Sequence, residues 1–176
     1  AAVHTKRKRH AYTLKDPTHA TAEQLLREGD LEGALDEYKA VATHAKQGMG
    51  EFKIRDENDN AVLTTAGFNY CAQGMILELM APAGDITTLK KSLECHQFGL
   101  YIREKCYSDR PYDPNIAISV AGIALAQMRM GDVRQSVKSL LRAGRIVDTA
   151  AGKEGSTIAQ CLCMLAKVCQ VAANKM

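Results

Sequence analysis

The chain has 176 residues, of which 46% are hydrophobic and 24% are charged, and its formal net charge is +3. This composition fits a globular chain with a sizeable buried core. Aromatic residues make up only 5% and Trp is absent, so aromatic platforms for stacking bases or sugars are sparse. The uncharged run 114–128 is polar in places and too short to cross a bilayer, and no membrane span is expected.

A basic arm, residues 1–16, is the first expected element. It carries four consecutive cations, Lys6, Arg7, Lys8 and Arg9. Without them, the rest of the chain has a formal charge of −1. Such an arm is typical of a nuclear import signal, of a segment that lies on nucleic acid, or of one that docks on an acidic protein. A solvated tail without a partner is the alternative.

A pair of antiparallel helices is expected next. The first helix runs over 17–28, Gly29 can end it in the left-handed conformation, and Asp30 can cap the helix that follows. Apolar residues of that second helix recur at the helical spacing i, i+3, i+4 and i+7. They are Leu31, Ala34, Leu35, Tyr38, Val41, Ala42 and Ala45.

The same Gly-Asp junction recurs at Gly84-Asp85 and at Gly131-Asp132. A surface loop is expected over 47–60, and a helix over 62–80. One face of that helix is formed by Phe68, Cys71, Ala72, Met75 and Leu79. A turn at 82–85 and a second helix over 86–106 complete the second pair.

Pro111 and Pro114 break the chain before a further helix over 115–130. Asp132, with Gln135 three residues later, resembles a capping box and begins the next helix, which ends near Gly152. A last helix is expected over 156–173. The stretch IAISVAGIALAQ from Ile116 aligns with IAQCLCMLAKVC, 42 residues later, so the helix pairs read as repeats.

The stretch REGDLEGALDEYKAV resembles the second helix of a tetratricopeptide repeat, and the segment from 114 to 168 resembles the longer repeats of kinesin light chain. The resemblance covers about 17–173 and implies an all-α fold: an α-solenoid of antiparallel helix pairs, about three repeats plus a terminal helix, with a tail at 174–176. It places Ala34, Tyr38, Ala124 and Leu140 at packing positions. It also implies a groove that binds a peptide or helix of another protein subunit. Ser136 and the uneven spacing of the Gly-Asp pairs depart from the family pattern.

The sequence offers no pattern typical of an enzyme, a metal site or a cofactor site. Cys161 and Cys163 point about 200° apart on a helix, and Cys95-His96 is an adjacent pair with poor ligand geometry. The stretch GKEGST has Glu154 where a phosphate-binding loop needs Ser or Thr. The six cysteines are interpreted as buried thiols of an intracellular, reducing compartment. A mitochondrial location is favoured, with cytoplasm or nucleus as alternatives.

Two more partner surfaces are predicted besides the arm. The cations Arg134, Lys138, Arg142 and Arg145 share one stripe of their helix, with Arg129 nearby, and suit an acidic or phosphate-bearing surface. The favoured interpretation of the stripe is nevertheless a solvated outer face. The last helix is apolar around most of its circumference, so we expect another chain or a second copy to cover it. Its partner-binding residues are Leu162, Leu165 and Val168.

The sequence is compatible with two alternative functions. The first is a non-catalytic scaffold or adaptor, one protein-interaction subunit of a larger assembly. The second is a peripheral, RNA-associated subunit of an organellar, mitochondrial ribosome whose basic arm lies on rRNA phosphates.

Overall fold

The computed structural model describes residues 19–47 and 57–150, together with Ala166 and Gln170. These residues form helices joined by short turns, and no strand occurs among them, which confirms the all-α expectation. The helices are α1 (His19–Arg27), α2 (Leu31–Gln47), α3 (Glu57–Met80), α4 (Ile86–Cys106), α5 (Pro114–Met130) and α6 (Val133–Ala150).

The helix boundaries follow the sequence closely. The bounds of α4 are those expected, and α5 begins one residue early at Pro114. The loop expected over 47–60 was too long, because α2 includes Gln47 and α3 begins at Glu57, five residues before its expected start. Asp113 accepts a hydrogen bond from the backbone N–H of Asn115, and Pro114 occupies the first turn, where its missing N–H costs nothing. The arm and the last helix lie outside the described residues, except that Ala166 and Gln170 are helical and exposed.

The three Gly-Asp junctions all stop one helix and restart the next. Gly29, Gly84 and Gly131 have φ of 79°, 86° and 89°, which is the left-handed region that an L side chain rarely adopts. The aspartate that follows each glycine then accepts a hydrogen bond from the backbone N–H three residues on. These bonds are Gly33 to Asp30 at 3.0 Å, Thr88 to Asp85 at 3.0 Å and Gln135 to Asp132 at 3.2 Å.

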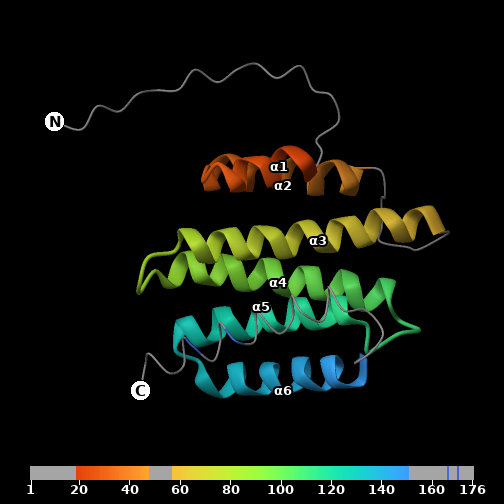
Figure 1. Cartoon of the computed structure of the whole chain (residues 1–176), viewed down its shortest axis with the longest axis vertical. Coiled ribbons are helices and arrows are strands. Elements are labelled where there is room, and N and C mark those ends of the chain that lie inside the picture. Colours follow the sequence, from red (N-terminus) through yellow and green to blue (C-terminus); the bar gives the residue numbers. More distant parts are fainter. Residues whose placement is uncertain (1–18, 48–56, 151–165, 167–169, 171–176) are drawn as a thin grey trace.

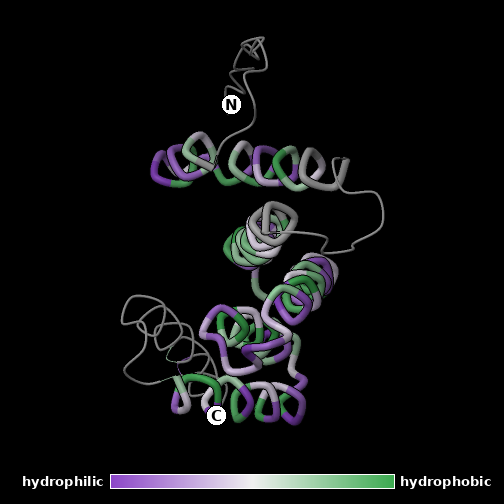
Figure 2. Tube along the Cα trace, turned by 90° about the vertical axis from the view of Figure 1, so that its right-hand side faces the viewer, coloured by the Kyte–Doolittle hydropathy of each residue, from purple (hydrophilic) through white to green (hydrophobic). Residues whose placement is uncertain are grey.

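From α2 to α6 the helices follow one another along the longest axis of the molecule, and α1 lies beside α2 at the same level (Figure 1). Each helix packs on the next one, and α3 also contacts α5. Figure 2 shows hydrophobic and hydrophilic stretches alternating along α6, at the lower end of the stack. This alternation is typical of a helix that buries one face only.

The four residues predicted at packing positions belong to buried clusters. Ala34 and Ala124 are fully buried, and Tyr38 packs in one cluster with residues of α1 and α3. Leu140 of α6 is partly buried against Ala124 of α5. The four residues predicted to pack between helices therefore do lie at helix contacts.

Ser136, the departure from the expected alanine, is buried between α5 and α6. Its hydroxyl donates to the backbone carbonyl of Ala124 at 2.7 Å. The hydrogen bond compensates for burying a hydroxyl at this position.

Within the described part of the chain, no helix combines the length and apolar character needed to cross a membrane.

Candidate binding groove and buried polar cluster

A small, mainly apolar groove lies along α3. It encloses about 190 Å³ and receives side chains from α1, α2, α4 and α5 as well as α3. All five residues predicted to share one face of α3 line it. The full lining is Leu26, Tyr38, Phe68, Cys71, Ala72, Met75, Ile76, Leu79, Arg103, Asn115 and Ile118.

The groove leaves apolar side chains in contact with solvent. Leu79 is 68% exposed and Phe68 is 38% exposed, although both belong to the apolar face of α3. Phe68 also packs against Tyr38 of α2, with ring centroids 6.4 Å apart. Neighbouring helices therefore cover only part of the apolar face of α3, and no described residue covers the remainder.

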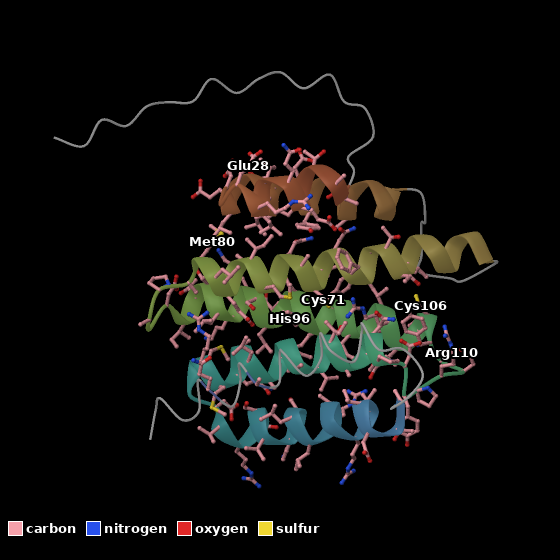
Figure 3. All side chains as sticks on the ribbon, in the orientation of Figure 1. Glu28, Cys71, Met80, His96, Cys106 and Arg110 are labelled. Atoms are coloured by element: carbon pink, nitrogen blue, oxygen red, sulfur yellow. The ribbon has the colours of Figure 1, made fainter. Side chains whose placement is uncertain are left out.

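A cluster of polar side chains is buried behind this groove, between α3, α4 and α5. Figure 3 shows Cys71 and His96 near the middle of the stack. His96 has no exposed surface, and its Nε2 lies 3.4 Å from Oε1 of Glu78. Neither ring nitrogen has a hydrogen-bond partner of good geometry among the described residues. Ser92 donates to the same Glu78 oxygen at 3.1 Å.

A second set of contacts joins Cys71 to α5. The thiol of Cys71 lies 3.0 Å from the hydroxyl of Ser119. Arg103, on α4, donates to that hydroxyl at 2.9 Å and to the carbonyl of Asn115 at 2.7 Å. The cluster thus places two basic and two acidic side chains in the core: Arg103, His96, Glu78 and Cys71.

Three glycines make room for the thiol and the imidazole. A Cβ at Gly74 would lie 2.6 Å from Nε2 of His96, and one at Gly122 would lie 2.4 Å from Cε1 of the same ring. A Cβ at Gly99 would lie 2.7 Å from Sγ of Cys71. Each glycine sits inside a helix, where glycine costs about 1 kcal/mol relative to alanine. The space around Cys71 and His96 is therefore kept at the expense of helix propensity.

The cluster shifts the pKa values of the Cys71 thiol and the His96 imidazole. Burial opposes ionisation of the Cys71 thiol, but the Arg103 charge, the His96 imidazole and the Ser119 hydroxyl outweigh it and hold its pKa below the ordinary 9.0. Burial alone would lower the pKa of His96, but the Cys71 and Glu78 side chains outweigh it and raise that pKa to about 9. Thiolate and imidazolium therefore stabilise each other.

The predicted basic stripe forms a separate surface on α6. Arg134, Lys138, Arg142 and Arg145 are all exposed. Arg142 pairs with Glu104 of α4, and no ion-pair partner for the other three occurs among the described residues. Lys138, Arg142 and Arg145 also line a shallow pocket of about 410 Å³. An apolar stripe runs beside the cations: Val133, Val137 and Leu141 are exposed as well.

Arg129, expected near that stripe, instead reaches back to α3. Its guanidinium donates to the carbonyls of Glu78 and Ala81, at the carboxyl end of α3. A cation there satisfies carbonyls that the helix leaves unpaired and complements the helix dipole.

The remaining predicted partner residues cannot be placed. Lys6 to Arg9 of the arm, and Leu162, Leu165 and Val168 of the last helix, lie outside the described residues. No group of three or more His, Cys, Asp or Glu side chains among residues 19–47 and 57–150 is arranged to hold a metal ion.

The buried cluster was not predicted from the sequence. Cys71 was expected only as a buried apolar thiol, and His96 only as a poor metal ligand. A usable signal was present, because Gly74, Gly99 and Gly122 each interrupt a helix interior, and such glycines mark close approach. Glu78 inside the apolar stretch GMILELM was a second signal.

Comparison with known proteins adds no relative: no family model, no curated protein and no solved structure matches the chain.

Proposed function

We propose that the protein is a non-catalytic scaffold of tetratricopeptide-repeat type, and that its groove along α3 binds an apolar side chain presented by another protein subunit. The observation that carries the proposal is the exposed part of the apolar face of α3, around Leu79 and Phe68. Exposed apolar surface in a concave site is typical of a docking position.

The size of the groove defines its occupant. About 190 Å³ of mainly apolar space suits one or two apolar side chains of an extended segment rather than a whole helix. Helices stacked in chain order, with short capped turns, support the repeat-type arrangement. An intracellular location, with a mitochondrial one favoured, remains part of this proposal.

Two leucines allow a matched experiment. Leu79 lies at the groove and Leu141 on α6, and they are 68% and 61% exposed. We would compare wild type, Leu79→Asp and Leu141→Asp in quantitative affinity capture from the native source. We expect a protein that wild type and Leu141→Asp retain and that Leu79→Asp loses by at least about tenfold.

Other outcomes contradict the proposal. If only Leu141→Asp lost the captured protein, the docking site would lie on α6. A fall in unfolding free energy of more than about 2 kcal/mol with Leu79→Asp would mean that a segment of this chain fills the groove, because substitutions at free surface sites stay within about 0.5 kcal/mol.

A second candidate is a peripheral RNA-associated subunit of an organellar ribosome. The specific observation in its favour is the set of exposed cations on α6, of which Arg134, Lys138 and Arg145 have no ion-pair partner among the described residues. In the same capture, RNA that is retained at low salt, lost steeply at higher salt and insensitive to Leu79→Asp would favour this candidate.

A further inference from the structure

The buried cluster has chemistry that docking in the groove does not use. Replacing a buried ion pair by well-packed apolar residues is often neutral or stabilising, so packing alone does not account for four ionisable side chains in the core. The space for the thiol and the imidazole also depends on three helix-interior glycines. These features are typical of a site with a chemical role, because perturbed ionisable groups gather at such sites.

Cys71 is the point where the cluster meets the groove. Its residue surface is only 3% exposed, yet it lines the groove together with Arg103. The groove is therefore the route by which a small molecule reaches Cys71. The Ser119 hydroxyl lies 3.0 Å from the sulfur, Arg103 donates to that hydroxyl, and His96 interacts with the thiol from the buried cluster.

We propose that Cys71 is an oxidation site for hydrogen peroxide, with His96 as the base that takes the thiol proton and Arg103 as the cation that stabilises the reacting sulfur. The inference requires the groove to be unoccupied, and it does not depend on the identity of the proposed partner. It concerns the groove only as the route by which a small oxidant arrives.

The reaction is a two-electron transfer. The Cys71 thiolate attacks one oxygen of the peroxide, so that an S–O bond forms and the O–O bond breaks. The sulfur is oxidised to a sulfenic acid and the peroxide is reduced. His96 holds the proton that the thiol gives up, and the second oxygen leaves as hydroxide into the groove, where it takes a proton from solvent to yield water. Hydrogen peroxide is the only oxidant that this reaction requires.

The chain contains its own controls. Cys95 on α4 is more exposed than Cys71, but burial and the Glu94 charge raise the pKa of its thiol to about 11. Cys106 is buried and its pKa is raised, chiefly by burial. If exposure governs oxidation, Cys95 reacts first. If the surrounding charges govern it, Cys71 reacts first.

The test treats the folded full-length chain with hydrogen peroxide near pH 7 and traps sulfenic acids with a cyclic diketone. Peptide mass spectrometry then gives the labelling rate at each cysteine. We expect Cys71 to be labelled at least about tenfold faster than Cys95 and Cys106. Equal rates, or labelling of Cys95 in preference to Cys71, would overturn the proposal.

A variant tests the role of the imidazole. His96→Gln keeps a similar side-chain volume and removes the base that takes the thiol proton. We expect it to slow labelling of Cys71 by about tenfold and to move the pH profile of labelling to higher pH. An unchanged rate and profile in a folded His96→Gln chain would exclude His96 from the reaction. If the variant does not fold, the comparison of cysteines in the wild-type chain still decides whether Cys71 is the site.

Discussion

Two cysteines on neighbouring helices illustrate how strongly residue properties depend on position. Cys71 and Cys95 were both expected to be buried thiols. In the structure, Arg103, His96 and Ser119 lower the pKa of Cys71 against the effect of its burial, whereas burial and Glu94 raise the pKa of Cys95 to about 11. The same residue type therefore has opposite acid–base behaviour in α3 and in α4.

Cys95 gives a prediction about alkaline stability. Its folded-state pKa of about 11 lies above the ordinary value of 9.0. Between these two pH values the unfolded chain has released a proton that the folded chain still holds, so stability present below pH 9 is lost as the pH rises toward 11. We expect the unfolding free energy of Cys95→Ser, measured by urea denaturation, to fall less than that of wild type over this window. If the unfolding free energies of the two proteins fell in parallel with pH, this prediction would be wrong.

At the scale of the element, the three Gly-Asp junctions and Asp113 mark helix ends in the described part of the chain. The turn between α5 and α6 is an example, because Gly131 ends one helix with φ of 89° and Asp132 caps the next. Nothing lies within 4 Å of a Cβ built on Gly131, so its requirement for glycine is one of backbone conformation alone.

Gly131→Ala tests that requirement against a matched substitution. Forcing alanine into the left-handed region costs about 1–2 kcal/mol, and we expect the unfolding free energy to fall by that amount. Gly144, inside α6, also has open space around its Cβ position but no left-handed φ. Gly144→Ala should stabilise the protein by up to about 1 kcal/mol, in the opposite direction. Denaturant unfolding of both variants measures the difference, and equal signs would show that the turn does not need glycine.

At the scale of the whole molecule, contacts run mainly between helices that are neighbours in sequence. α5 is buried along most of its length because it lies between α4 and α6 and also contacts α3. At the other end, α1 packs on α2, and α2 connects the pair to the remainder through α3. A stack of this kind divides its stability among local interfaces.

Hydrogen exchange should resolve this division. We expect backbone amides of α1 and α2 to open at a lower free energy than those of α4 and α5, because the first pair has one neighbouring interface and the central helices have two. Native-state exchange followed by mass spectrometry in rising denaturant gives both values. A single opening free energy for all four helices would indicate one cooperative unit instead.

The sequence by itself determined the helical class, the helix bounds within a few residues, and the apolar face of α3 that lines the groove. These features depend on contacts between residues at most a few positions apart, such as the bond from Thr88 to Asp85 that begins α4. Only the tertiary structure decided that Leu79 is left exposed, that Arg129 binds the end of α3, and that Cys71 meets His96. The physical reason is that burial and charge around a side chain are set by neighbouring helices, whose alignment no local pattern specifies.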